Sequence, residues 1–95
     1  MPEEFEWDVQ KASLNLRKHG VAFKDAQLVF NDLFATHSFD VDANYVEQRM
    51  IATGTVNGVL LTVVYTERGE RTRLISARKA TKHEQREYYR DQAPE

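Results

Sequence analysis

The 95-residue sequence contains no cysteine, which excludes disulfide bonds and thiolate metal sites and is typical of a reducing compartment. It also lacks a long hydrophobic run. The longest, VLLTVVY at 59–65, is far shorter than the roughly 20 residues that span a bilayer. The acidic start, MPEEFEWD, has neither the basic residues nor the apolar stretch of a secretory signal. We therefore expect a cytoplasmic protein that does not enter a membrane.

Several catalytic and metal-binding motifs are also missing. There is no glycine-rich phosphate loop and no pair of histidines at metal-binding spacing, and the three histidines, His19, His37 and His83, are scattered along the chain. We therefore expect no metal ion and no cofactor. His83 lies near a basic segment and is a weak candidate for an acid or base, whereas His19 is more typical of a helix end.

The composition is that of an ordinary globular protein. Hydrophobic residues make up 41% of the chain and charged residues 29%, with four glycines and two prolines. A chain of this length can close one hydrophobic core. We therefore expect residues 1–95 to form a single domain.

The charges are divided unevenly along the chain. The formal net charge is −2, but residues 1–67 carry five Lys or Arg against ten Asp or Glu, and residues 68–90 carry eight against three. A block of cations in a small domain favours an anionic partner, most often RNA or DNA. A solvated cationic face without a ligand explains the same count equally well.

Hydrophobic periodicity and turn residues predict an α+β fold. The expected elements are a strand at 5–7, helices at 9–19 and 23–30, strands at 34–41, 48–56, 59–68 and 71–79, and a helix at 82–90. Asp8 and Gly20 bracket the first helix, and a Thr81 to Glu84 capping box opens the last. Two-residue turns at 57–58 and 69–70 join consecutive strands. We expect two N-terminal helices packed on a four- to five-stranded antiparallel sheet, with a C-terminal helix.

The periodicity also predicts which side chains pack. In the first helix Val9, Ala12 and Leu16 share one face, and Leu14 points away from it. With two-residue turns, one side of the sheet collects the expected core residues Met50, Ala52, Val56, Val59, Leu61, Val63, Tyr65 and Leu74. The two N-terminal helices are expected to cover that side.

The same register gathers arginines on the opposite face of the sheet. Arg49, Thr66 and Arg73 form a row across three strands, with Arg68 and Arg71 beyond it as RNA-binding candidates. Like charges side by side destabilise a sheet by up to about 1 kcal/mol per pair, so packing alone gives little reason for the row. Because a guanidinium clamps phosphate in a planar fork, a polyanion site is the better explanation.

Three glutamates near the row have two interpretations. In the first, they neutralise the arginines in surface ion pairs of little energetic worth. In the second, Glu67 is a candidate general base, although the register points it to the core side. RNA carries its own nucleophile, so cleavage requires only alignment, a base, an acid and positive charge around the phosphorane. The glutamates are Glu47, Glu67 and Glu70.

A cationic stripe follows on the C-terminal helix. Lys82, Arg86 and Arg90 recur at intervals of four residues, with Tyr88 and Tyr89 beside them. Basic residues interleaved with aromatics suit single-stranded RNA, which makes Lys82 and Arg86 RNA-binding candidates. The solvated side of an amphipathic helix has the same pattern.

Four stretches of the chain carry a family pattern. They are FEWDVQKASLNLRKHGVAF, EQRMIATG, VVYTERG and RLISARKAT, followed by a charged tail with tyrosines. In this order they resemble the BrnT toxins of bacterial type II toxin-antitoxin systems over nearly the whole chain. The resemblance implies a RelE-like fold, ribonuclease activity that inhibits translation, and neutralisation by a BrnA-like antitoxin. The ribbon-helix-helix part of such an antitoxin binds operator DNA, so we expect DNA contact only through the complex.

The resemblance also implies which side chains act. The basic positions of the family, and the tail tyrosine of the RelE-like group, correspond to Arg49, Arg73, Arg78, Lys79 and Tyr88. Tyr89 is as well placed as Tyr88. With an uninterrupted register, Arg78 faces the helical layer and Lys79 the open face, so the two are expected to meet only at the end of the strand.

Three functions are compatible with these patterns. The first is the endoribonuclease toxin, and the second is a non-catalytic module that holds RNA or DNA with the same cations. The third is a protein that docks an acidic partner chain. An exposed Leu14 marks part of an antitoxin contact in the first case and is an ordinary surface leucine otherwise.

Overall fold

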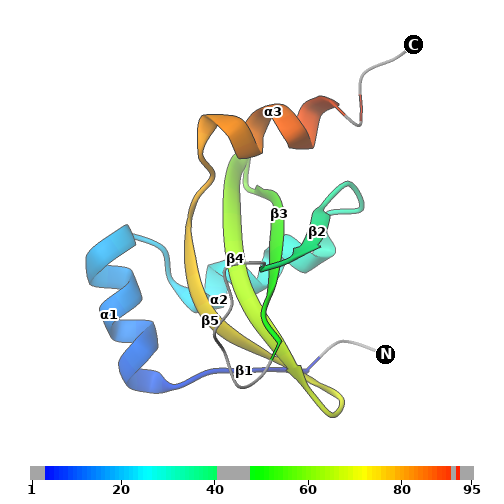
Figure 1. Ribbon diagram of the computed structural model, residues 1–95. Coiled ribbons are helices and arrows are strands. Elements are labelled where there is room, and N and C mark those ends of the chain that lie inside the picture. The colour runs from blue at the N-terminus through cyan, green and yellow to red at the C-terminus, as the bar shows by residue number, and fades with distance from the viewer. Residues whose placement is uncertain (1–3, 41–47, 91, 93–95) are drawn as a thin grey trace.

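The computed structural model describes residues 4–40, 48–90 and 92, which form a mixed five-stranded sheet flanked by helices (Figure 1). The elements are β1 (Glu4–Glu6), α1 (Val9–His19), α2 (Phe23–Ala26), the 3-10 helix η1 (Gln27–Asn31), β2 (Thr36–Phe39), β3 (Met50–Val56), β4 (Val59–Arg68), β5 (Arg71–Lys79) and α3 (Lys82–Arg90). The strand order is β1-β5-β4-β3-β2. The predicted α+β class is confirmed.

The prediction of a purely antiparallel sheet is wrong. Strands β2 to β5 form the predicted antiparallel meander, but β1 pairs with β5 in parallel, with Glu6 beside Arg73. Parallel neighbours require a long connection, which the two helical segments and the meander supply here. The predicted strand at 34–41 is shorter, because β2 ends at Phe39 and residue 41 lies outside the described residues.

The local signals for turns and helix ends are confirmed. Asn57 and Gly58 have φ angles of 52° and 82°, as a tight left-handed turn requires. The Asp8 carboxylate accepts hydrogen bonds from two backbone N–H groups at the start of α1. In α3, the Thr81 N–H donates to Glu84 Oε1 at 2.8 Å and the Glu84 N–H donates to Thr81 Oγ1 at 3.2 Å, which is the predicted capping box.

A β-bulge in β5 changes the direction of every side chain after it. The pairing of β4 with β5 shifts after Val64, and Ile75 is the extra residue. Because side chains alternate along a strand, one extra residue exchanges the two faces. The prediction that Arg78 faces the helical layer and Lys79 the open face is therefore wrong. Arg78 lies on the open face, and Lys79 pairs with the core residue Leu61.

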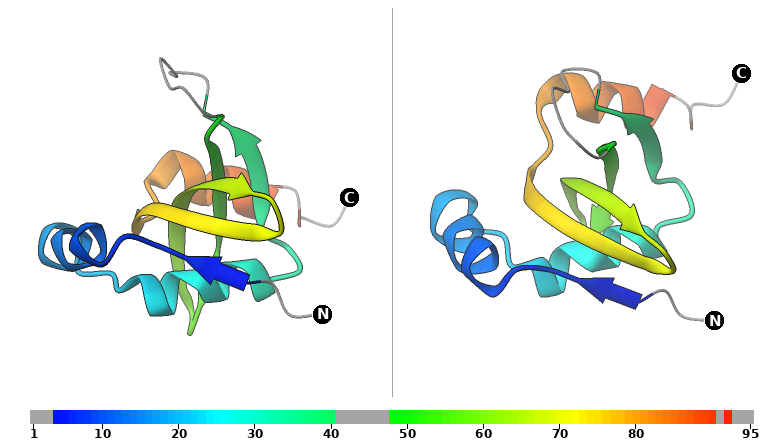
Figure 2. Two further views of the ribbon diagram at one scale, coloured as in Figure 1. Left: turned by 90° about the horizontal axis from the view of Figure 1, so that it is seen from below. Right: turned by 60° about the horizontal axis from the view of Figure 1, so that its bottom comes forward.

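The core lies between one face of the sheet and the α2–η1 segment (Figures 1 and 2). The predicted helix at 23–30 is one α-helical turn that continues as η1, and it buries Phe23, Ala26 and Val29. The predicted core positions that are confirmed as buried are Ala52, Val56, Leu61, Val63, Tyr65 and Leu74. Met50 is half-buried. Val59 is 44% exposed because it follows the turn at the edge of the core.

The predicted packing of Val9 and Leu16 of α1 over the sheet is wrong, and of the predicted face only Ala12 packs against the core. Val9 and Leu16 are 77% and 50% exposed, whereas Asn15 is buried. The Asn15 side chain donates to the Ala77 carbonyl at 2.8 Å and accepts from the Ala77 N–H at 3.0 Å. Beyond β1 the edge of β5 has no strand partner, and buried backbone groups require hydrogen bonds. Helix α1 therefore lies beside this edge (Figure 1).

Candidate active site

The open face of the sheet, on the side away from α2 and η1, is partly covered by α3. The helix crosses one end of the strands (Figure 1). Its residue Glu84 is half-buried, and the hydroxyl of Thr62 on β4 donates to Glu84 Oε1 at 3.0 Å. No other helix of the described residues covers this face, so α3 and the strands beside it form a corner.

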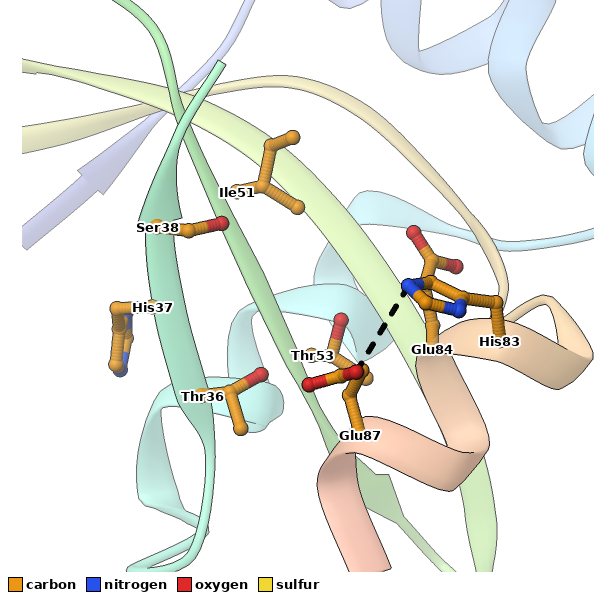
Figure 3. Close-up of a pocket in the computed structure, with 8 residues that line it drawn as sticks. All are labelled: Thr36, His37, Ser38, Ile51, Thr53, His83, Glu84 and Glu87. Atoms are coloured by element: carbon orange, nitrogen blue, oxygen red, sulfur yellow. Dashed lines mark ion pairs between the residues drawn. The ribbon is translucent and has the colours of Figure 1, made fainter. Parts of the chain in front are cut away.

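A hollow of ≈ 430 Å³ lies in this corner, between α3 and the β2–β3 pair (Figure 3). It is lined by Thr36, His37, Ser38, Ile51, Thr53, His83, Glu84 and Glu87. His83 points toward Glu87, with 3.9 Å between Nε2 and Oε1. The His37 ring points away and lies within hydrogen-bond distance of the Tyr65 hydroxyl, at 3.1 Å. The groups that can exchange protons inside the hollow therefore come from α3.

Arg78 is held beside the hollow by Glu84. Its Nη1 and Nη2 donate to the two carboxylate oxygens at 2.7 and 3.0 Å, the planar two-bond geometry that arginine favours. Burial alone would raise the pKa of Glu84, but hydrogen bonds from Arg78, the Thr81 N–H and Thr62 outweigh it and hold this pKa at about 2. The hydrogen bond to Glu84 raises the pKa of Arg78. Both groups are therefore charged at neutral pH.

The predicted arginine row lies on the same open face. Thr66 pairs with Arg73, and Met50, the first residue of β3, pairs with Tyr65, which places the preceding Arg49 opposite Thr66. The row is four residues along β4 from Thr62, the partner of Arg78. At about 3.3 Å per residue, the row and Arg78 are roughly 13 Å apart.

The counter-ions of Arg71 and Arg73, near the β4–β5 turn, are glutamates from β1 that were not predicted from the sequence. Arg73 Nη1 lies 2.9 Å from Glu6 Oε2, and Arg71 Nε lies 3.2 Å from Glu4 Oε2. The parallel pairing of β1 with β5 aligns these side chains. Of the glutamates named from the sequence, Glu47 lies outside the described residues.

Glu67 and Lys79 do not lie on the open face. Glu67 pairs with the buried Thr72, and Lys79 pairs with the buried Leu61, so both point to the helical side at the ends of their strands. Lys79 lines a separate depression together with Tyr89. Neither side chain lines the hollow beside Arg78.

Tyr88 is only 3% exposed and ties α3 to the sheet. Its hydroxyl donates to Asp32, which also accepts from the Thr55 N–H at 2.8 Å and the Thr55 hydroxyl at 3.0 Å. Burial raises the pKa of Tyr88, and its hydrogen bond to Asp32 raises it further. This tyrosine positions α3 and does not reach the hollow, whereas Tyr89 is exposed.

The cationic stripe of α3 lies on its solvent side. Lys82, Arg86 and Arg90 are exposed, whereas Glu84 and Tyr88 face the sheet. Arg90 also binds Glu87, with 2.6 Å between Nη2 and Oε2. The burial pattern agrees with the solvated side of an amphipathic helix, and neither Lys82 nor Arg86 lines the hollow.

The sequence only partly predicts the two acid-base groups of the hollow. It indicates His83 as a weak candidate and gives no prediction for Glu87. The available signal was the i, i+4 spacing of these residues next to the capping-box glutamate. Nothing local indicated that the helix would fold over Thr53 and Thr62.

Two kinds of feature were not found in the described part of the chain. Among residues 4–40, 48–90 and 92, no group of three His, Asp or Glu side chains is arranged so that it could hold a metal ion. No helix among these residues is long and apolar enough to cross a membrane.

An arginine-bearing sheet face next to a hollow with proton-exchanging groups is typical of small proteins that bind or process nucleic acid. Residues 7–84 match the family described as "Ribonuclease toxin, BrnT, of type II toxin-antitoxin system", and the chain belongs to that family. No curated protein matches the chain. Membership confirms the resemblance seen in the sequence and implies a ribonuclease toxin with an RNA substrate and an antitoxin partner.

Proposed function

We propose that this toxin cleaves RNA at the hollow through the substrate's own 2′-hydroxyl and without a metal ion, and thereby inhibits translation in the cytoplasm. The observation that carries the proposal is the hollow lined by His83, Glu84 and Glu87 of α3, in which Glu84 also binds the guanidinium of Arg78. The whole of residues 1–95 acts as one toxin domain in this proposal.

His83 is the proposed general base, and Glu87 orients its imidazole. The base removes the 2′-hydroxyl proton as the 2′-oxygen bonds to phosphorus. The bond from phosphorus to the 5′-oxygen then breaks, and that oxygen takes a proton from water, which leaves a 2′,3′-cyclic phosphate and a 5′-hydroxyl end. The hydroxide that remains takes the proton from His83 and restores the neutral base. An imidazole accepts protons near neutral pH, and the 3.9 Å separation from Glu87 can shorten when substrate binds.

Arg78 is the proposed stabiliser of the phosphorane. Negative charge grows on its equatorial oxygens during attack, and a cation already fixed in place need not reorganise to meet it. The hydrogen bonds to Glu84 fix Arg78 in this way. Glu84, with a pKa held at about 2, is a poor base near neutral pH and has a positioning role.

The row of Arg49 and Arg73 is proposed to bind phosphates that flank the cleaved bond. It lies on the same face as Arg78, with Arg68 and Arg71 continuing toward the β4–β5 turn. Lys79, Glu67 and Tyr88 have no catalytic role in this proposal, because they lie on the helical side or are buried. Lys82 and Arg86 are left as solvent-side residues. Five arginines therefore remain from the sequence candidates: Arg49, Arg68, Arg71, Arg73 and Arg78.

The partner is proposed to be a BrnA-like antitoxin. The family implies an antitoxin, and the resemblance of the sequence to BrnT toxins supports the ribbon-helix-helix type. Operator DNA is then contacted only through the toxin-antitoxin complex. The RelE-like classification of the fold remains a prediction from the same resemblance.

The test is RNA cleavage by the antitoxin-free protein in excess EDTA. We expect new RNA ends from the wild type and a loss of about 10²- to 10⁴-fold for His83→Ala, the usual range for removing a general base. His19→Ala is the matched control, because His19 lies at the end of α1 and outside the hollow. Cleavage unchanged in His83→Ala would contradict the assignment. Salt-sensitive RNA binding without new ends would instead indicate a non-catalytic binding module.

A further inference from the structure

A second depression, between α1 and β5, lies outside the proposed active site. It has a volume of ≈ 200 Å³ and is lined by Lys11, Leu14, Asn15, Lys18, His19, Ile75 and Ser76. Two features identified above create it: α1 lies beside the edge of β5, and the β-bulge makes Ile75 the extra residue of that strand. We call this depression the α1–β5 groove.

The two sides of the groove are joined by hydrogen bonds. Asn15 is buried and bonds both backbone groups of Ala77 on β5, and its Nδ2 also donates to the Val21 carbonyl at 2.9 Å. Two hydrogen bonds from one side chain therefore hold α1 against the strand, and a third holds the segment that follows α1. A preformed surface binds a partner without the cost of ordering itself.

The groove has an apolar centre and a cationic rim. Leu14, 60% exposed, and the half-buried Ile75 form the centre. Lys11 and Lys18 lie one turn to either side of Leu14 on the same face of α1, about 10 Å apart along the helix. Neither lysine forms an ion pair with another described residue, and no described carboxylate lines the groove.

The size of the groove favours a protein side chain over a nucleotide. Sites for small organic ligands usually enclose about 300–1,000 Å³, more than this groove offers. A cavity of ≈ 200 Å³ suits one large apolar side chain of the kind that anchors a protein interface. An exposed leucine at the centre also contributes little to phosphate binding, whereas protein interfaces combine an apolar centre with a polar rim.

We propose that the α1–β5 groove docks an amphipathic acidic helix of the antitoxin. One large apolar side chain of that helix enters between Leu14 and Ile75, and carboxylates about two turns apart pair with Lys11 and Lys18. This arrangement is the helix-in-groove mode of recognition with complementary charge. The inference rests on the proposed neutralisation by an antitoxin and adds where and how it binds.

The position of the groove also links docking to inhibition. Ser76, on its wall, lies on β5 between Arg73 and Arg78, and its partner Val64 lies on the open face between the Arg49–Arg73 row and Arg78. A chain segment that leaves the groove past Ser76 therefore runs onto the face proposed to bind RNA. Neutralisation follows from occupying that face, without any change in the fold.

The test compares two leucines on opposite faces of the same helix. Leu14→Asp places a negative charge at the centre of the groove, and Leu16→Asp makes the same change on the far side of α1, where Leu16 is 50% exposed. Affinity for the purified cognate antitoxin is measured by calorimetry, and RNA cleavage by the free toxin is measured alongside. We expect Leu14→Asp to weaken the complex by about 30-fold or more, as for an interface hot spot, and Leu16→Asp to change it by less than about 3-fold.

Charge reversal gives a second measurement. We expect Lys11→Glu with Lys18→Glu to slow association about tenfold at low salt, whereas Arg17→Glu on the same helix has a smaller effect. Equal antitoxin affinities for the Leu14 and Leu16 variants, or no complex with the wild type, would overturn the inference. So would a groove variant that loses RNA binding but keeps the antitoxin, which would make the groove part of the RNA path. If the wild type cleaves no RNA while Leu14→Asp still weakens the complex, the catalytic proposal fails and the docking site stands.

Discussion

The open face carries two groups of arginines that differ in how their charge is held. The tip arginines, Arg68, Arg71 and Arg73, lie near the β4–β5 turn, and the Arg71 ion pair with Glu4 has both side chains more than half exposed, at 58% and 67%. Arg78 is 37% exposed, and Glu84, which binds it in a two-bond arrangement, is 22% exposed. Burial alone does not separate the groups, because Arg73 and its counter-ion Glu6 are 28% and 24% exposed and are joined by one hydrogen bond. The difference teaches that a count of cations locates a surface, whereas a two-bond carboxylate clamp at the edge of a hollow locates a site.

The two groups also have different origins in the chain. The tip arginines follow from the regular register of two hairpins, with counter-ions that β1 adds from the far end of the sequence. Arg78 reaches the open face because of the bulge at Ile75, and it is fixed because α3 folds back over the sheet. Among the described arginines, Arg78 is the one whose carboxylate partner, Glu84, lines a hollow with groups that can accept or donate protons.

The largest expected contrast is between Arg78→Ala and Arg71→Ala. Loss of one fixed transition-state donor costs about 10²- to 10³-fold in the cleavage rate, so we expect a fall of that size for Arg78→Ala. For Arg71→Ala, whose ion pairs are exposed, we expect less than about tenfold. Cleavage rates on one RNA, with unfolding curves for each variant, measure the contrast. Equal losses would contradict the division of the face into two groups.

The pH dependence of stability tests whether Glu84 is held by Arg78 as described. Its folded-state pKa of about 2 lies below its ordinary value of 4.5, so the folded protein binds fewer protons and this contribution to stability rises with pH. It is fully present above pH 4.5 and is lost as pH falls toward 2, a total on the order of 2–3 kcal/mol.

The variant that isolates this effect is Glu84→Gln. Its unfolding free energy, measured by urea titration at several pH values, should approach that of the wild type as pH falls from about 5 to 2. Glu70→Gln, in the exposed turn, controls for the loss of one negative charge. A constant difference between Glu84→Gln and wild type across this range would show that the carboxylate is not fixed as described.

Two adjacent tyrosines test how α3 is attached. Tyr88→Phe removes the hydroxyl that donates to Asp32 and should lower the unfolding free energy by about 1–2 kcal/mol. Tyr89→Phe, on the exposed neighbour, should change it by less than about 0.5 kcal/mol. Because α3 carries the hollow's acid-base groups, we also expect a few-fold slower cleavage for Tyr88→Phe. Thermal unfolding of the two variants measures the difference, and equal stabilities would contradict an anchoring role.

The smallest expected effect comes from removing a counter-ion of the tip arginines. Glu6→Gln removes an ion pair with Arg73 and should change stability by less than about 1 kcal/mol. RNA affinity should rise a few-fold at low salt and return to the wild-type value at high salt, because the gain is electrostatic. Fluorescence anisotropy with a single-stranded RNA measures this change. Weaker RNA binding by the variant would argue against phosphate contacts at the tip.

Features fixed by neighbouring residues were predictable from the sequence. The Asp8 cap, the Asn57-Gly58 turn and the Thr81 to Glu84 capping box each depend on side chains within a few positions of one another. These three local features determine the start of α1, the β3–β4 hairpin and the start of α3. The arginine row of Arg49 and Arg73 followed because both lie on the unshifted side of the bulge.

Features fixed by distant contacts were not predictable in the same way. Asn15 is buried because the edge of β5 lacks a strand partner, a fact that depends on where β1 stops. The bulge at Ile75 reverses the expected directions of Arg78 and Lys79, and no glycine marks it. Sequence periodicity therefore assigned the faces correctly only up to the bulge.

The most direct test of the proposed chemistry is a single 2′-deoxy substitution in the RNA. An oligonucleotide is first mapped for its cleavage site in EDTA, and the nucleotide that supplies the attacking 2′-oxygen is then replaced by its deoxy form. We predict that cleavage at that bond stops and that the normal product carries a 2′,3′-cyclic phosphate, detected by mass spectrometry. Cleavage that continues at the deoxy position, or products with a 5′-phosphate, would contradict attack by the substrate's own hydroxyl.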